Sequence, residues 1–309
     1  GKQADAAYWL DHQARMVSSS YYLQELPEWV KAFNDYWHLK YTDLDTWDYF
    51  LAPEAYTESL PDDADFESRS FSGTNALPYD IKQAIKEKSV DVIKQTPFAN
   101  TMLTEFALLV LGEENLGVDS HTDLLAISYS STDYIGHAFG PQSVEVQDAY
   151  IRLDRDFAHL IKELDARVGR ENYVMFLTSD HGAANTPSDQ RFHYVSTAQL
   201  KAQLNTLTQE KFGLPLIKNI GAQQLWLDTA ALAEMKLDRT AIQEEIKSMI
   251  YANSALNFVK VFTRQEVENC SAPDCDYFKR SFISALAGDL FYMLPFGYME
   301  RSENYGTTH

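Results

Sequence analysis

Three consecutive segments between residues 123 and 179 leave few alternatives for the fold of this chain. "DLLAISYS" (123–130) and "YVMFLTS" (173–179) are short apolar runs bounded by polar residues, which is typical of buried β-strands. Between them, residues 144–169 repeat apolar side chains at helical spacing and end at Gly169. Strand, long helix and strand form a βαβ unit. The sequence therefore predicts an α/β fold with a mostly parallel central sheet flanked by helices.

The remaining periodicity predicts further helices and a smaller subdomain. Residues 26–35, 100–117 and 239–253 have helical spacing, whereas 223–228 and 257–263 resemble strands. The polar segment 53–78 is predicted to be a long surface loop. We divide the chain into an aromatic-rich, cap-like region (1–97), an α/β core (98–190), an inserted small α/β subdomain (191–290) and a return to the core (291–309).

Composition narrows the classes of partner. The 309 residues carry a formal net charge of −19, which argues against a nucleic-acid polymer as partner. No stretch approaches the ~20 apolar residues of a membrane span. The only two cysteines, Cys270 and Cys275, are spaced for a small disulfide-closed turn, which would indicate an oxidising compartment. A free thiol pair is the alternative interpretation.

Two pairs of acidic and imidazole side chains follow the predicted strands. Asp133 and His137 lie in "SSTDYIGHAFGP" (130–141) after the first strand, and Asp180 and His181 lie in "TSDHG" (178–182) after the second. Ligands bind at the carboxyl ends of parallel strands, and Asp and His are ligands of Zn²⁺ and related ions. Either pair alone is often a coincidence in a loop. Two pairs in one βαβ unit predict a metal site.

The order Asp-x3-His, Asp-His-Gly and a distant His309 in "GTTH" resembles the alkaline phosphatase superfamily. Within it, "FLTSDHG" and "SYSSTDYIGHAFGP" look similar to the type I phosphodiesterase/nucleotide pyrophosphatase group. The likeness is closest to the bacterial periplasmic phosphate-irrepressible alkaline phosphatases, and it also includes "SSSYYLQELPEWVKAFN" (18–34), "TPFANTMLTEFA" (96–107) and "SVEVQDAYIRLDRDF" (143–157).

The resemblance implies a two-zinc phosphate monoester hydrolase that acts by in-line phosphoryl transfer in the periplasm or after secretion. Asp133, His137 and His309 would bind one Zn²⁺, and Asp180 and His181 would contribute to the second site. Its substrate would be a small phosphate ester. The sequence gives no indication of the oligomeric state.

The chain departs from the family pattern in one respect. In this family a Thr or Ser nucleophile, and a further Asp ligand of the second zinc, precede the part seen here. Thr132 and Thr308 neighbour the predicted ligands but do not match the nucleophile position. We therefore expect five of six protein ligands, no identified nucleophile, and a chain that is an internal part of a longer enzyme.

Other interpretations stay open at this point. A phosphodiesterase or nucleotide pyrophosphatase would share these metal ligands, and a non-catalytic metal-binding fragment would lack the nucleophile. Asp and His ligands would also accept Mn²⁺, Fe²⁺ or Co²⁺. Glu145 and Asp148 are predicted to be first-turn acids that favour the helix dipole. The aromatic residues between 8 and 56 are expected to pack a core, with a substrate-binding wall as the alternative.

Overall fold

The structure is a computed structural model that describes residues 4–69, 71, 73–186, 190–301 and 306–308. The chain divides into two compact units. The first comprises Gly1–Thr186 with Tyr305–His309, and the second comprises Pro187–Asn304. The α/β class is confirmed, whereas the finer division into four regions stays a prediction. Among the described residues, no helix combines the length and apolarity that a membrane crossing requires.

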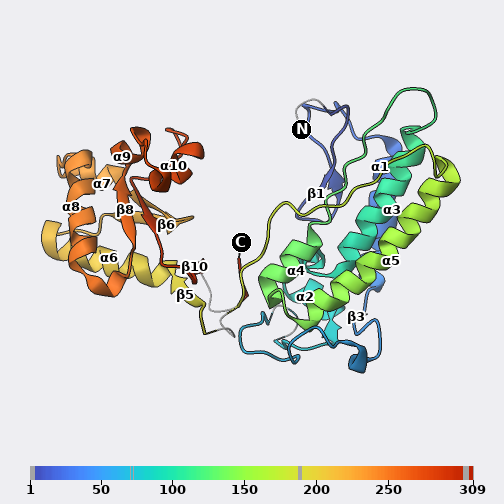
Figure 1. Cartoon of the computed structure of the whole chain (residues 1–309), viewed down its shortest axis with the longest axis horizontal. Helices are drawn as coiled ribbons and strands as arrows, with labels where there is room; N and C mark the ends of the chain where they lie inside the picture. Colours follow the sequence, from blue (N-terminus) through green and yellow to red (C-terminus); the bar gives the residue numbers. More distant parts are fainter. Residues whose placement is uncertain (1–3, 70, 72, 187–189, 302–305, 309) are drawn as a thin grey trace. The chain divides into compact units, whose positions relative to one another are not determined.

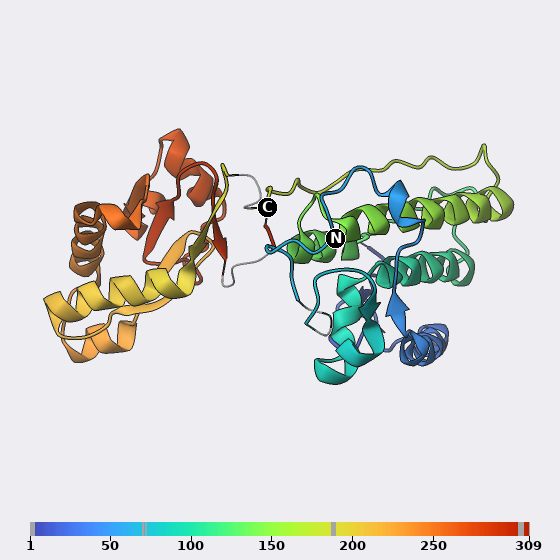
Figure 2. The same cartoon turned by 90° about the horizontal axis from the view of Figure 1, so that it is seen from below.

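Helices dominate the first unit, and the longest two, α3 and α5, lie side by side (Figure 1 and Figure 2). The helical elements are α1 (Glu28–Asp43), the 3-10 turn η1 (Pro53–Ala55), α2 (Ile81–Glu87), the 3-10 turn η2 (Val90–Gln95), α3 (Pro97–Glu113), α4 (Ser131–Phe139) and α5 (Val144–Arg167). Two antiparallel pairs of very short strands complete it, β1 (Trp9–Leu10) with β2 (Met16–Val17) and β3 (Thr46–Trp47) with β4 (Tyr79–Asp80).

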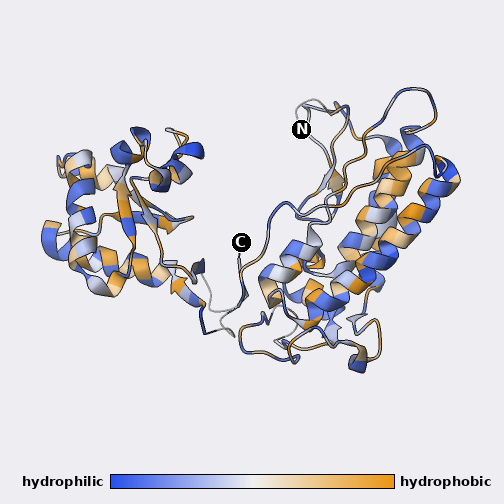
Figure 3. Ribbon diagram, in the orientation of Figure 1, coloured by the Kyte–Doolittle hydropathy of each residue, from blue (hydrophilic) through white to orange (hydrophobic). Residues whose placement is uncertain are grey.

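The predicted helices form because their apolar spacing allows one face to be buried. Helix α5 begins at the predicted point, where the Ser143 hydroxyl caps the backbone N–H of Val146. Figure 3 shows hydrophobic and hydrophilic residues alternating around this helix. The predicted helices at 26–35 and 100–117 correspond to α1 and α3. Local pattern was sufficient at all three places.

Aromatic side chains fill the core of the first unit. Trp47, Phe71, Tyr79 and Phe139 are fully buried, and the rings of Phe71 and Phe139 stack with centroids 6.1 Å apart. Such ring pairs stabilise a core beyond the area that they bury. Core packing is thus the main role of the aromatic residues, although Trp9 and Tyr21 are exposed. Phe71 belongs to the segment predicted as a surface loop, so that prediction is wrong for its middle part.

Of the two acids predicted for the first turn of α5, only Glu145 lies there, and both are fully buried. Asp148 is fully buried, and its carboxylate accepts hydrogen bonds from Trp47 Nε1 (2.7 Å), the Phe50 backbone N–H (2.9 Å) and Arg152 Nε (2.6 Å). Glu145 is equally inaccessible. The segment that precedes β4 covers this end of α5, which periodicity within the helix could not reveal.

The two segments predicted as buried strands, 123–130 and 173–179, are not strands. Both are drawn as coil in Figure 1, and neither belongs to a sheet formed by the described residues. Leu124, Val174 and Phe176 are exposed by 84%, 92% and 79%. A strand is buried only when neighbouring strands accept its backbone hydrogen bonds and cover its faces. Among the described residues no such neighbours exist for these segments, so apolar composition alone misjudged their environment.

The second unit is built around a four-stranded antiparallel sheet in the order β6-β7-β9-β8. Its strands are β6 (Ile217–Gly221), β7 (Gln224–Leu227), β8 (Lys260–Thr263) and β9 (Leu290–Met293). A separate parallel pair joins β5 (His193–Ser196) to β10 (Tyr298–Arg301), and this is the parallel pairing found within the described residues. The helical elements are α6 (Thr197–Phe212), α7 (Thr229–Glu234), α8 (Arg239–Ala252), the 3-10 turn η3 (Ser254–Leu256), α9 (Arg264–Glu268) and α10 (Pro273–Arg280).

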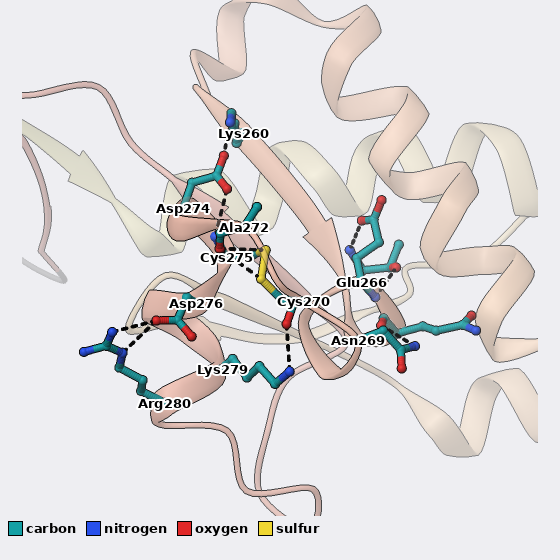
Figure 4. The surroundings of a disulfide bond; sticks show 12 residues. Lys260, Glu266, Asn269, Cys270, Ala272, Asp274, Cys275, Asp276, Lys279 and Arg280 are labelled. Atoms are coloured by element: carbon teal, nitrogen blue, oxygen red, sulfur yellow. Dashed lines mark hydrogen bonds and ion pairs between the residues drawn. A yellow bond between two sulfur atoms is a disulfide. The ribbon is translucent and has the colours of Figure 1, made fainter.

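Cys270 and Cys275 form the predicted disulfide at the start of α10 (Figure 4). The Lys279 ammonium, near the C-terminal end of α10, donates a hydrogen bond to the Cys270 carbonyl at 2.7 Å. This contact is a second connection between α10 and the residues of the disulfide. Both cysteines are buried. The alternative interpretation, two free thiols, therefore does not apply to this structure.

Candidate metal centre

Asp133 and His137 lie one turn apart on α4, on the same side of the helix. His137 Nε2 is 3.4 Å from Asp133 Oδ1. The sequence placed this pair in a loop after a strand, so the pair is confirmed as neighbours but the local structure was wrong. Helical i, i+4 spacing brings the two side chains together. The helix ends at Gly140, where φ is +93° and a Cβ atom would come within 2.4 Å of Thr186 Cγ2.

A backbone carbonyl from the end of the chain orients the imidazole of His137. Its Nδ1 lies 2.7 Å from the carbonyl oxygen of Thr307, and the Thr307 N–H donates to the His137 carbonyl at 3.0 Å. A carbonyl only accepts, so this contact assigns the proton to Nδ1 and presents the Nε2 lone pair toward Asp133. Carbonyl contacts of this kind orient metal-binding histidines.

The same terminal segment also contacts the extended segment that carries the second motif. The Thr307 hydroxyl donates to the Ala184 carbonyl at 2.7 Å, and the Ala184 N–H donates to the Thr308 carbonyl at 2.8 Å. Residues 306–308 therefore join α4 to the segment that follows His181. Backbone hydrogen bonds bring the two motifs together, although 44 residues separate His137 from His181.

The second motif directs its imidazole toward the same carboxylate. His181 Nε2 lies 3.9 Å from Asp133 Oδ1 and 3.5 Å from Asp180 Oδ2. His181 Nδ1 is 2.9 Å from the Gly182 carbonyl oxygen, so its proton is also assigned to Nδ1. Asp133 Oδ1 therefore stands between two imidazole Nε2 atoms.

The structure thus brings together Asp133, His137, Asp180 and His181, whereas the fifth predicted ligand, His309, lies outside the described residues. Two imidazole nitrogens and two carboxylates are a donor set that suits Zn²⁺ and other divalent transition ions. Asp180 is 88% exposed, so the centre opens to solvent on this side. The assignment of these residues as ligands stays a prediction.

Several other hydroxyl, phenol and imidazole side chains of the chain have different surroundings. The Thr132 hydroxyl accepts a hydrogen bond from Asn100 Nδ2 at 3.1 Å. Tyr134, next to Asp133 on α4, is 45% exposed and so is not a core residue. His159 is exposed on α5, and His193 stacks against Tyr298 in the second unit with ring centroids 4.8 Å apart.

Sequence reasoning missed Thr307 as a positioning residue. It acts through its backbone carbonyl, which every residue type carries, so no side-chain signature marks it. Its position two residues before the predicted ligand His309 was the only signal available.

The fold is that of a family of phosphoric ester hydrolases. The chain belongs to the type I phosphodiesterase / nucleotide pyrophosphatase family, whose model matches residues 2–290. This family lies within the alkaline phosphatase superfamily, as the sequence motifs predicted.

Two curated relatives and a solved structure are similar to the chain over most of its length. It is 32% identical to alkaline phosphatase PafA of Elizabethkingia meningoseptica over 100% of the chain and 58% of the relative. It is 36% identical to alkaline phosphatase PhoV of Synechococcus elongatus over 84% of the chain and 48% of the relative. The crystal structure of wild-type PafA matches with a TM-score of 0.84 and 30% identity, covering 98% of this chain and 59% of that one. The chain therefore spans somewhat more than half the length of PafA.

Proposed function

We propose that this chain forms part of a zinc-dependent phosphate monoester hydrolase and contributes most of the protein ligands of its two-metal centre. The observation that carries the proposal is the convergence of His137 and His181 on Asp133, with each Nδ1 held by a backbone carbonyl. The similarity to PafA and PhoV, both alkaline phosphatases by name, supports the choice of reaction.

Each residue of the centre has a defined part in this proposal. Asp133, His137 and His309 would hold one Zn²⁺, and Asp180 and His181 would help to hold the other. Such ions, when bound, stabilise the charge on the phosphoryl oxygens and activate the attacking group. The contacts of Thr307 and Gly182 keep the imidazoles oriented, so that no ordering of these rings is required during the reaction.

Local charge gives a second reason for cations at this centre. The chain carries a net charge of −19, and Asp133 and Asp180 add negative charge where an anionic phosphate ester would sit. Coulomb repulsion would oppose substrate binding unless bound cations reversed the local sign. We assign no nucleophile within these 309 residues, since neither Thr132 nor Thr308 matches the nucleophile position of the family.

The first test is the metal content of the folded chain after dialysis against trace Zn²⁺. About two Zn²⁺ ions per chain are expected, or one if only the Asp133, His137 and His309 site is complete. Asp133→Asn should lower the content, whereas Asp154→Asn, an exposed position on α5, should leave it unchanged. A folded wild-type chain without bound zinc would contradict the proposal.

The alternative reaction is phosphodiester hydrolysis, which the description of the matching family favours. A protein of the relatives' full length that contains these residues would separate the two. A higher kcat/KM for p-nitrophenyl phosphate than for bis-p-nitrophenyl phosphate supports the monoesterase, and the reverse order supports the diesterase.

We also propose a periplasmic or secreted location. The disulfide between Cys270 and Cys275 supports it, because such bonds persist in oxidising compartments. Cell fractionation of the native host, followed by immunoblotting, tests this proposal; recovery in the cytoplasmic fraction alone would contradict it.

A further inference from the structure

Three carboxylates gather beneath the N-terminal end of α5, apart from the residues assigned to the candidate metal centre. Asp62 and Glu67 come from the segment between η1 and β4, and Glu145 comes from the first turn of α5. Each offers an oxygen atom, and these three oxygens lie within 4.8 Å of one another. Glu67 is 2% exposed and Glu145 is fully buried.

A cluster of acids at a surface would need no explanation, but these two glutamates each bury an oxygen that no group in the described part of the chain satisfies. Glu67 Oε2 accepts from the Ala64 N–H at 2.9 Å, and one oxygen of Glu145 accepts from the Tyr79 hydroxyl. Glu67 Oε1 and Glu145 Oε2 have no hydrogen-bond partner. A buried polar atom without a partner is costly, and native proteins rarely retain one without a reason.

Within the part of the chain that the structure describes, no cation offsets this charge, because none of the ion pairs there joins Asp62, Glu67 or Glu145 to Lys, Arg or His. Burial and the neighbouring Glu145 carboxylate raise the pKa of Glu67 to about 8, and burial raises the pKa of Glu145 to about 7. Both directions reflect the cost of holding several like charges in one dry place.

We propose that Asp62, Glu67 and Glu145 form a binding site for a hard divalent cation, Ca²⁺ in preference to Mg²⁺. Carboxylate oxygens are the preferred ligands of both ions. Ca²⁺ binds oxygens at about 2.3–2.6 Å, so oxygens that lie within 4.8 Å of one another can share one such ion. Ca²⁺ also tolerates the irregular geometry of a site shared between a loop and a helix.

The site is accessible from one side. Asp62 is half-buried, and it lines an open pocket together with Tyr49, Tyr56 and Val144. The Tyr49 hydroxyl and the Leu77 N–H already hold Asp62 Oδ2, at 2.6 and 3.1 Å, so this carboxylate is preorganised rather than mobile. A hydrated ion can therefore bind Asp62 first, and the carboxylates of the two buried glutamates can then replace some of its water ligands.

Binding here would stiffen the support of the candidate metal centre. The residues on either side of Glu67 contact both parts of that centre: the Ser68 N–H donates to the Ala138 carbonyl at 2.9 Å, and the Phe66 carbonyl accepts from the Gly306 N–H. Ala138 follows His137, and Gly306 precedes Thr307. A cation on Glu67 would thus hold in place the backbone that orients the His137 imidazole.

The test is direct binding of Ca²⁺ to the full chain after chelator treatment. Isothermal titration at pH 8 should detect one Ca²⁺ per chain, with at least tenfold weaker binding of Mg²⁺. Tb³⁺ at the same site should show luminescence sensitised by the nearby tyrosines. Ca²⁺ at 100 times its Kd should raise the midpoint of thermal unfolding by about 5 °C. The weakest extracellular Ca²⁺ sites have a Kd of about 1 mM. The proposal is overturned if the folded wild-type chain binds no Ca²⁺ up to that concentration.

Variants locate the site. Glu67→Gln retains the size of the side chain and should weaken Ca²⁺ binding at least tenfold, whereas Glu58→Gln, an exposed acid of the same segment, should not change it. Equal effects of the two changes contradict the assignment. An Asp133→Asn, His181→Ala chain should lose zinc and keep Ca²⁺, which separates this site from the proposed catalytic one. If the wild-type chain binds no Ca²⁺ and Glu67→Gln makes the chain more stable, the Glu67 carboxyl is protonated and no cation binds there.

Discussion

His137 Nδ1 lies 2.7 Å from the carbonyl oxygen of Thr307, although 170 positions separate the two residues along the chain. This contact connects the helix that carries Asp133 with the segment that ends at the predicted ligand His309. We therefore predict two separable roles for the terminal residues: Thr307 orients the His137 imidazole, and His309 donates a metal ligand.

Deletion of residues 305–309 should weaken zinc binding more than His309→Ala does. Both changes remove the predicted ligand, but only the deletion removes the Thr307 carbonyl that orients His137. Loss of such a contact typically costs about 10–100-fold in metal affinity. Competition titration against a chromogenic zinc chelator measures the difference, and equal affinities of the two variants would show that Thr307 has no positioning role.

Asp148→Ala should strongly destabilise the first unit. The fully buried carboxylate accepts from Trp47, Phe50, Arg152 and the Tyr56 hydroxyl, and its removal deprives four donors of this acceptor. Breaking a buried charged network of this kind costs about 3–5 kcal/mol. Urea unfolding followed by tryptophan fluorescence measures the change. Asp154→Ala, at an exposed position of the same helix, should change stability by less than about 0.5 kcal/mol.

Glu266 should stabilise the second unit at neutral pH, and this contribution should be lost in acid. Burial raises the pKa of this carboxyl, but hydrogen bonds from Lys247 and the Thr263 N–H outweigh burial and leave the pKa below its usual value. A lowered folded-state pKa contributes stability above the ordinary value near 4.5, and this contribution is lost as the pH falls through the folded-state value.

Glu266→Gln should therefore cost about 0.5 kcal/mol at pH 7, because a neutral Gln can still accept from the Thr263 N–H in the capping box but makes weaker hydrogen bonds than the carboxylate. The Lys247 ion pair adds little because Glu266 is 44% exposed. The difference from wild type should shrink below about pH 4. Chemical unfolding at several pH values measures it, with Glu244→Gln at an exposed position of α8 as control. A difference that is constant from pH 7 to pH 3 would contradict the assignment.

Backbone amides of 124–128 and 174–178 should exchange with deuterium far faster than those of α3 and α5. Within the described ranges, no N–H of either segment donates a hydrogen bond, and apolar side chains such as Phe176 are exposed. Exchange requires no opening of structure under these conditions. Peptide-resolved hydrogen exchange of the folded chain measures this, and protection equal to that of α5 would show that both segments are paired in solution.

The helices could be predicted, and the two Asp/His motifs singled out as candidate ligands, because the information for both is local. Apolar spacing and a capping serine define α5, and Ile242, Ile246 and Ile250 form the buried face of α8. Asp133, His137, Asp180 and His181 stand out by residue type and spacing alone. The disulfide was equally local, since its two cysteines are the only ones in the chain.

Burial, in contrast, was decided by tertiary structure. The runs 123–130 and 173–179 have the composition of inner strands, yet a strand needs neighbours to accept its hydrogen bonds, and the described residues provide none. Glu145 has the sequence position of an acid that favours the helix dipole, yet a loop rich in polar residues covers it, because Phe71 and Leu77 anchor that loop in the core. Residue types thus specified which groups could do chemistry here, and only the packing of distant segments determined which of them meet and which are removed from water.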